Sequence, residues 1–393
     1  MDILVFAIED GRFGPARFPQ MLHNAGLSVA ALCPSDNILA QSAFLDAQHV
    51  LPRSRHIRSI AKALAAAIKA APPKLIIPGD EQAVILLQAF AKGRCASLIG
   101  PEAKAVIAAS LGDPRMFAAS LFKSDTIALA RTLGISVPQS VTVASVGEAH
   151  RAGERMGYPV YLKQSFSWAG LGVAKCDDAK ALRAACKAAR PRGMMVRRLV
   201  RRVLGRDWYP AVTAMDVQSG IAGSTAMVSV LAWQGRLIGG LCAVRLAKIH
   251  PYGPSTSVRL GHDRSMADAA GKMVAALGLT GFASFDFMVP DDGSEPVLIE
   301  CNPRPVPVHH LGRHIGVDLA AAFARVLNGE IQAGEPQFPD RNLDVVLFPH
   351  ALDRALHLEG GLLDMPDEDP GLIRHVANRT SAKGTDRPAR LAA

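Results

Sequence analysis

Several features are scarce or missing in this chain of 393 residues, and each absence removes a class of protein. The six cysteines stand far apart, with no Cys-x-x-Cys pair and no histidine at zinc-finger spacing, so we expect neither a disulfide framework nor a structural zinc. The longest weakly polar run, residues 221–233, is too short for a bilayer. Residues 1–4 enter a strand pattern directly, so we expect no signal peptide, no membrane partner and a cytoplasmic protein.

Acidic residues are outnumbered, and the net charge is +9. Much of the excess comes from one cluster of seven arginines: Arg190, Arg192, Arg197, Arg198, Arg201, Arg202 and Arg206. No aromatic residue lies among them, and we find no helix-turn-helix or RNA-binding motif. The positive charge could attract nucleic acid, a membrane surface or small anions, and without such a motif we do not expect nucleic acid as a partner.

The chain is long enough for two or three domains, and its 49% hydrophobic and 20% charged residues are typical of a folded protein. Residues 2–7, 27–32 and 74–77 read as buried strands, with a helical pattern over residues 57–71. This order predicts a parallel sheet covered by helices, in a first domain of residues 1–108. The three-glycine spacing of a dinucleotide-binding turn is missing, which argues against a Rossmann dehydrogenase.

Two acids, Asp80 and Glu81, follow the third of these strands. The carboxyl ends of strands in open α/β sheets carry ligand-binding loops, so these acids could bind an amine. Asp is also a preferred helix N-cap, and capping of the next helix is the role we favour.

A β-hairpin is predicted near residue 290. Two β-rich apolar runs, residues 282–289 and 297–299, flank the turn-forming sequence of residues 290–294. Because successive strand side chains point to opposite faces, Glu300 and Asn302 share one face.

Asp286 lies on the partner strand, so two carboxylates and an amide oxygen can converge across the hairpin. Such a hard-oxygen site suits Mg²⁺, which takes its remaining ligands from water and phosphates. Arg304 follows two residues later, and a guanidinium there suits a phosphoryl group or a substrate carboxylate.

The motifs Phe285-Asp286-Phe287 and Ile299-Glu300-Cys301-Asn302-Pro303-Arg304 resemble the metal-binding end of the ATP-grasp superfamily. This superfamily includes ATP-dependent carboxylate-amine ligases, biotin carboxylase and carbamoyl phosphate synthetase. The resemblance implies that Asp286, Glu300 and Asn302 hold Mg²⁺ on the phosphates of ATP, with Mn²⁺ as an alternative ion. It also implies a mixed α/β and α+β fold, in which an N-terminal parallel α/β domain precedes a two-lobed ATP-grasp domain with antiparallel sheets.

The resemblance extends to the sequence upstream of the hairpin. The stretch from Lys123 to Pro138 is similar to the helix-then-strand entrance of the fold, and the sequence GYPVYLK ends at a second lysine, Lys163. Both lysines are implied to contact phosphates. A following loop with Ser165, Gly170 and Gly172 would close over the phosphates with its backbone N–H groups.

Residues 194–200 are expected to form the strand between the two lobes, where the family reads adenine through its backbone. Arg198 and Val200 are the candidates for that contact. The family often has Glu where this chain has Arg197, a departure at the adenine amino group. Asp207 matches an acid that accepts hydrogen bonds from the ribose hydroxyls.

A basic loop rich in Gly, Pro and hydroxyl groups precedes the hairpin, and loops on rigid sheets often carry function. We favour acceptor or γ-phosphate binding by Arg245, Lys248 and Arg259. The remaining domain limits are expected at 109–197 for the small lobe, 198–330 for the large lobe and 331–393 for a C-terminal extension with a loose end.

By this resemblance, ATP phosphorylates a substrate carboxylate, and an amine attacks the acyl phosphate in an ADP-forming ligase reaction. The partners are then a small carboxylate and a small amine, and the family allows a homodimer. Two alternatives stay open. One is another ATP-grasp chemistry, such as bicarbonate activation or phosphotransfer, and the other is a nucleotide-binding protein without catalysis.

Overall fold

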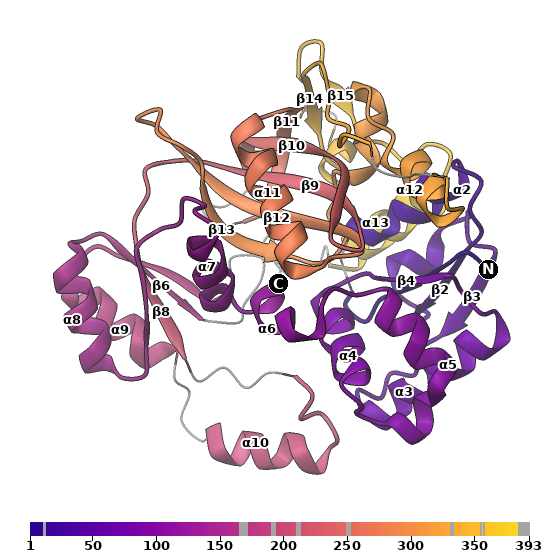
Figure 1. Ribbon diagram of the computed structural model, residues 1–393, viewed down its shortest axis with the longest axis horizontal. Helices are drawn as coiled ribbons and strands as arrows, with labels where there is room; N and C mark the ends of the chain where they lie inside the picture. Colours follow the sequence, from indigo (N-terminus) through magenta and orange to yellow (C-terminus); the bar gives the residue numbers. More distant parts are fainter. Residues whose placement is uncertain are drawn as a thin grey trace.

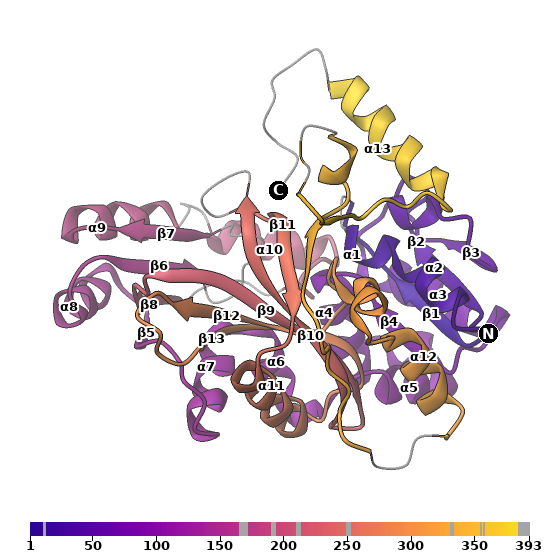
Figure 2. The ribbon, with the colours of Figure 1, turned by 90° about the horizontal axis from the view of Figure 1, so that it is seen from above.

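The structure is a computed structural model that describes residues 1–10, 13–164, 172–189, 194–209, 214–248, 253–330, 334–353, 356 and 358–383. These residues are organised around three β-sheets, which Figures 1 and 2 show from two directions. The mixed α/β and α+β fold expected from the sequence is confirmed, because one sheet is parallel and the other two are largely antiparallel.

The N-terminal sheet is parallel, with the strand order β3-β2-β1-β4. Its elements are β1 (Ile3–Phe6), α1 (Phe13–Ala16), α2 (Phe18–His23), β2 (Val29–Cys33), η1 (Ile38–Gln41), β3 (Ala47–Val50), α3 (Ile57–Ala70), β4 (Leu75–Pro78), α4 (Glu81–Ala91) and α5 (Ala96–Ala109). The helical spacing of α3 buries Ile60, Leu64 and Ile68 against this sheet. The predicted βαβ organisation is confirmed, although the sequence pattern had not indicated β3.

A second sheet is antiparallel, with the order β5-β8-β6-β7. The elements of this part are η2 (Pro114–Met116), α6 (Phe117–Leu121), α7 (Lys123–Thr132), β5 (Ser140–Val143), α8 (Val146–Met156), β6 (Val160–Gln164), β7 (Val173–Cys176), α9 (Ala179–Ala188), α10 (Met194–Val203) and β8 (Met215–Ser219). Helices α8 and α9 cover one face of the sheet. Because β8 pairs with β5 and β6, this sheet extends to Ser219, and the boundary proposed at 197/198 falls inside α10.

The largest sheet has the order β13-β12-β9-β10-β11-β14-β15. Its elements are β9 (Gly223–Trp233), β10 (Arg236–Lys248), β11 (Ser255–Gly261), α11 (Arg264–Leu277), β12 (Gly281–Pro290), β13 (Val297–Asn302), η3 (His309–Ile315), α12 (Leu319–Leu327), β14 (Leu343–Val346), η4 (His350–Leu352), β15 (Leu362–Leu363) and α13 (Pro370–Lys383). One face packs on α11, and the other shares a core with the N-terminal sheet through residues such as Phe18 and Phe282, whose rings meet edge to face. The N-terminal domain and the large sheet therefore bury a common hydrophobic core.

Residues 334–383 return along the large sheet to the N-terminal domain. Strand β14 pairs with β11, and Asp364 forms a buried ion pair with Arg17 at 2.9 Å. Asp369 accepts a hydrogen bond from the backbone N–H of Ala43 at 3.0 Å. The expected extension is thus an integral layer of the fold, and the loose end predicted beyond it lies outside the described residues.

Residues 194–200, which the sequence analysis expected to be a strand, are part of helix α10. That prediction was wrong because the apolar positions Val196, Leu199, Val200 and Val203 repeat at helical spacing, not at the alternate spacing of a strand. Figure 1 shows α10 well apart from the labelled strands β6 and β8. Its Val196, Leu199 and Val203 side chains are between 64% and 76% exposed.

No single helix within the described ranges is long and apolar enough to span a membrane, while α4 and α5 meet the length and composition test only as a pair bent by 104°.

Candidate active site

The predicted β-hairpin is formed by β12 and β13, and it carries the proposed metal ligands. Asp286 pairs with Glu300, and Ser284 pairs with Asn302, so the three oxygen-bearing side chains share one face. The pairing then shifts between Asp286 and Phe287, a β-bulge of the kind that re-aims side chains beside functional sites. The arrangement expected from the strand period is therefore present.

The chemistry of these donors fits a divalent cation. Asn302 donates a hydrogen bond to Asp286 Oδ2 at 3.3 Å, whereas the buried Oδ1 has no hydrogen-bond partner among the described residues. Burial, followed by the charge of Glu300, raises the pKa of Asp286 to about 7, with Arg304 and Lys123 opposing the rise. A bound cation would favour the ionised form of Asp286 and so oppose this rise in its pKa.

The described part of the chain contains no cluster of three or more His, Cys, Asp or Glu side chains able to enclose a metal by themselves. Mg²⁺ does not need one, because it is commonly held by one or two carboxylates together with phosphate oxygens and water.

Both predicted phosphate-binding lysines lie close to this face. Lys123, at the start of α7, is buried and forms an ion pair with Glu300 at 2.9 Å. Lys163, on β6, donates a hydrogen bond to the amide oxygen of Gln218. Burial, followed by the charge of Lys123, lowers the pKa of Lys163 to about 8. The two ammonium groups repel each other, and a polyanion bound between them would relieve this repulsion.

Two residues that surround Lys163 were not predicted from the sequence. Asp216 is the direct cross-strand neighbour of Lys163, and it accepts a hydrogen bond from Thr142 at 2.6 Å. Gln218, two positions further on the same strand face, holds the ammonium group. The available signal was the alternation of polar and apolar residues over 215–218, which marks one polar face.

The predicted loop over the phosphates begins after β6 and ends before β7. Gln164 donates its backbone N–H to the carbonyl of Gly172 at 3.0 Å, which holds the two ends of the loop together. Gly172 has a φ of +74°, a conformation that favours glycine. Ser165 and Gly170 lie outside the described residues, so their proposed contacts stay predictions.

The adenine side of the site differs from expectation. Arg198 and Val200 belong to α10, whose backbone N–H and C=O groups are committed to the helix, and Val200 is 49% exposed. Asp207, expected near ribose, forms an ion pair with Arg94 of the N-terminal domain at 2.9 Å. The next residue, Trp208, is buried in the core of that domain. The structure does not bring these predicted residues to Lys123 and Lys163.

The three basic candidates of the preceding loop separate in space. Arg245 lies on the same sheet face as Asp286 and donates a hydrogen bond to the hydroxyl of Ser255 at 3.0 Å. Burial lowers the pKa of Arg245, and the charge of Asp286 opposes this change. Arg259 pairs with Val244 and so lies on the opposite face, where it forms a two-pronged contact with Asp344 at 2.7 and 2.8 Å. The prediction that Arg259 belongs to the site was wrong, because the register of β11 against β10 turns its side chain to the face opposite Asp286. Lys248 is exposed at the end of β10.

Arg304 completes the site from the end of the hairpin. Its Nη2 contacts Glu81 of the N-terminal domain at 2.5 Å and Asn302 at 3.3 Å, and its Nη1 donates to the carbonyl of Pro305 at 3.0 Å. The neighbouring acid Asp80 accepts the backbone N–H of Ala83 at 2.9 Å, which confirms that it caps α4. Burial, followed by the charge of Glu9, raises the pKa of Asp80 to about 6.

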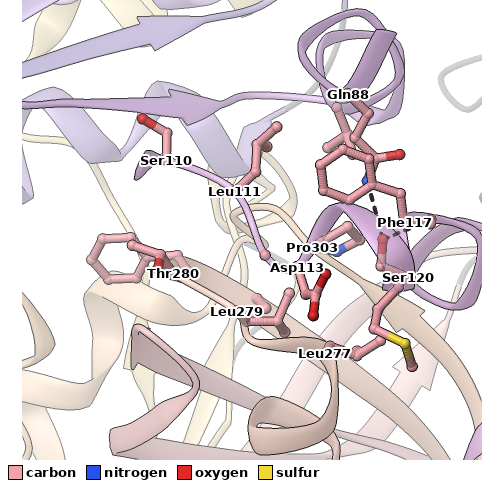
Figure 3. Close-up of a pocket in the computed structure, with 15 residues that line it drawn as sticks. Gln88, Ser110, Leu111, Asp113, Phe117, Ser120, Leu277, Leu279, Thr280 and Pro303 are labelled. Carbon is pink, nitrogen blue, oxygen red and sulfur yellow. Dashed lines mark hydrogen bonds between the residues drawn. The ribbon is translucent and has the colours of Figure 1, made fainter. Parts of the chain in front are cut away.

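A small pocket lies beside Pro303, the residue before Arg304, and is drawn in Figure 3. Gln88 donates to the hydroxyl of Ser120 at 3.1 Å, and that hydroxyl donates to the carbonyl of Phe117 at 3.0 Å. Gln88 and Ser120 are already hydrogen-bonded to each other, so we assign no ligand to this pocket.

Comparisons with known proteins match these same stretches. The family model described as carbamoyl-phosphate synthase L chain, ATP binding domain, covers residues 123–200, and the one described as ATP-grasp domain covers residues 205–307. The carbamoyl phosphate synthase large chain of Rubrobacter xylanophilus is 27% identical over 187 residues, which are 44% of this chain and 16% of that protein. The chain therefore spans only a small part of the length of such relatives.

Solved structures show the same fold over most of the chain. The biotin carboxylase domain of Hydrogenobacter thermophilus 2-oxoglutarate carboxylase, a dimer solved with MgADP, ADP and bicarbonate, is 16% identical with a TM-score of 0.63, covering 87% of this chain and 73% of that one. N5-carboxyaminoimidazole synthetase from Staphylococcus aureus, solved with ADP, is 12% identical with a TM-score of 0.62, covering 88% and 82%. The hairpin and both lysines lie inside the matched ranges, so residues 123–200 and 205–307 carry the sequence pattern of the ATP-grasp superfamily.

Proposed function

We propose that the protein is an ADP-forming ATP-dependent ligase that activates a substrate carboxylate as an acyl phosphate for attack by an amine. One observation carries the proposal: Lys123 from helix α7 and Lys163 from strand β6 converge on the carboxylate face that Asp286 and Glu300 form on the large sheet. The two carboxylates can bind a metal ion, and the two lysines can bind the phosphate oxygens of a polyphosphate held by that metal.

In this proposal, each residue has a role that follows from its chemistry. Asp286, Glu300 and Asn302 would hold Mg²⁺, which when bound neutralises phosphate charge and orients the phosphoryl group. Lys123 would exchange its contact with Glu300 for a phosphate oxygen, and Lys163 would do the same with Gln218.

The acceptor side would be formed by the two arginines that share this face. Arg304 would donate to the transferring phosphoryl group, and Arg245 would bind the substrate carboxylate. No enzyme nucleophile is needed, because the carboxylate attacks the γ-phosphorus directly and ADP leaves. The amine then attacks the acyl carbon and releases phosphate.

The test is Mg²⁺-dependent release of phosphate from ATP, with ADP distinguished from AMP, against pools of small carboxylates and amines. The wild type should form ADP and phosphate only when a carboxylate and an amine are both present, and Glu300→Gln should lose this activity. Formation of AMP, or equal turnover by the variant, would overturn the proposal.

Bicarbonate activation is a second candidate, favoured by the similarity to a carbamoyl phosphate synthase and to a biotin carboxylase domain solved with bicarbonate. Adding bicarbonate as a separate arm of the same assay distinguishes it. Turnover with bicarbonate and no other carboxylate would favour it over the ligase.

A nucleotide-binding protein without catalysis is the third candidate. The observation in its favour is the position of Asp207, which contacts Arg94 and not the phosphate site. It predicts MgATP binding to the wild type without turnover in any arm.

A further inference from the structure

Glu81 occupies a special position in the N-terminal sheet. From β1 the chain passes to β2 and β3 on one side, and then returns to β4 on the other side of β1. The carboxyl ends of β1 and β4 therefore flank the point where strand order reverses, which is where open α/β sheets bind ligands. Glu81 is the first residue of α4, three positions after the end of β4, and its buried side chain contacts Arg304, which follows the hairpin of the large sheet.

The backbone around Glu81 is tightly fixed. The fully buried Asp80 accepts hydrogen bonds from the N–H groups of Ile8 at 2.5 Å and Glu9 at 2.9 Å, which ties the loop after β4 to the loop after β1. At Gly79, an added Cβ would lie 2.9 Å from the Cβ of Ala7, so only glycine fits. The carboxylate of Glu81 is thus presented from a rigid support.

This carboxylate contacts Arg304 in a way that leaves one nitrogen of the guanidinium, Nε, without a partner within the described residues. Arg304 Nη2 is taken by Glu81 and Asn302, and Nη1 by the carbonyl of Pro305. The buried Nε has no hydrogen-bond partner within the described residues. A guanidinium fixed through its two terminal nitrogens can offer Nε to an oxygen of a third group without searching for its orientation.

We propose that Glu81 is a positioning residue for phosphoryl transfer: from the N-terminal domain it holds the guanidinium of Arg304 beside the metal-binding face. The inference rests on the proposed function. Asp286 and Glu300 also attract Arg304. Once a divalent cation offsets their charge, Glu81 is the carboxylate that still balances the guanidinium, since Coulomb attraction depends on the net charge nearby.

The first test is a binding measurement with Glu81→Gln, which keeps the shape and removes the charge. Glu102→Gln, an exposed glutamate of the same domain, is the matched control. MgADP alone and MgADP with fluoroaluminate, a mimic of the transferring phosphoryl group, are titrated by calorimetry. We expect Glu81→Gln to bind MgADP within about twofold of the wild type but to lose about tenfold or more of the extra affinity given by fluoroaluminate.

Equal losses with both ligands would mean a merely structural role, and no loss with either would mean no role; both results overturn the inference. Glu81→Asp keeps the charge on a shorter side chain, so its affinity for MgADP with fluoroaluminate should lie between those of the wild type and Glu81→Gln. The same measurement on Glu81→Asp tests the inference if Glu81→Gln does not fold. In the phosphate-release assay, Glu81→Gln should lower kcat with little change in the KM for ATP. A wild type that binds neither ligand would refute the proposed function itself, whereas a binding wild type matched by Glu81→Gln would refute only the role of Glu81.

Discussion

The buried ion pair between Arg17 and Asp364 allows the sharpest prediction about stability. The two side chains are only 6% and 2% exposed, and their ends meet at 2.9 Å. Asp364 also contacts His310 at 2.9 Å. Asp364→Asn would leave Arg17 buried without its counter-charge, and breaking one side of a buried pair typically costs about 3–5 kcal/mol.

Urea unfolding followed by circular dichroism measures this cost. With a urea dependence of about 3 kcal/mol per molar, the expected loss moves the midpoint down by about 1 M or more. The matched control is Asp36→Asn, which breaks the exposed pair with Arg53, where the side chains are 53% and 84% exposed. Exposed pairs contribute about 0–1 kcal/mol, so the control should hardly shift.

The pH dependence gives an independent check on the same pair. Burial raises the pKa of Asp364, but the charge and hydrogen bond of His310 and the charge of Arg17 outweigh it and lower the pKa to about 2. A lowered folded-state pKa contributes stability that is present above the ordinary Asp pKa of about 4 and is lost as pH falls toward about 2. Equal midpoints for Asp364→Asn and Asp36→Asn at pH 7 would refute the reasoning about the buried pair.

Three further predictions concern the site. Arg245→Ala should lower ligase turnover about tenfold or more, whereas Arg259→Ala should leave turnover nearly unchanged, because the two side chains lie on opposite faces of the sheet; steady-state kinetics of both variants would decide. In the metal-free protein, the raised pKa of Asp286 means that the free energy of unfolding falls as pH rises from about 4 to 7. Asp286→Asn should therefore raise the melting temperature at pH 8 but not at pH 4. The same gain at both pH values would contradict this. Lys163→Met should weaken MgATP binding about tenfold or more in calorimetry, since it removes a cation from the phosphate site, and unchanged affinity would exclude the lysine from that site.

Local sequence patterns were enough to predict the hairpin and the shared face of its oxygen-bearing side chains. Alternation places Glu300 and Asn302 on one strand face, and the turn sequence between the two runs fixes which strand pairs with which. The helix caps were similarly readable, as Asp80 shows. These features depend on residues close together in the chain.

Other features depend on register or on distant contacts, and the sequence could not reveal them. The side chain of Arg259 points to the face opposite the site, whereas that of its neighbour Val258 points to the same face as Arg245. Only the pairing of β10 with β11 decides which of the two faces Arg259 takes. The contact of Glu81 with Arg304 joins residues 223 positions apart. For residues 194–200, the error was one of period: a short apolar run was interpreted as a strand, although its spacing continued for two helical turns.

The contacts of the C-terminal segment also have a consequence for the order in which the protein can mature. Gln20 and Ser42, both in the N-terminal domain, find partners in Glu368 at 2.7 Å and Asp369 at 2.5 Å. Domains of a nascent chain generally fold in the order of their synthesis. Here the N-terminal domain lacks these polar partners until a segment 327 positions beyond Ser42 has been added, so its final packing has to wait for the chain that follows the large sheet.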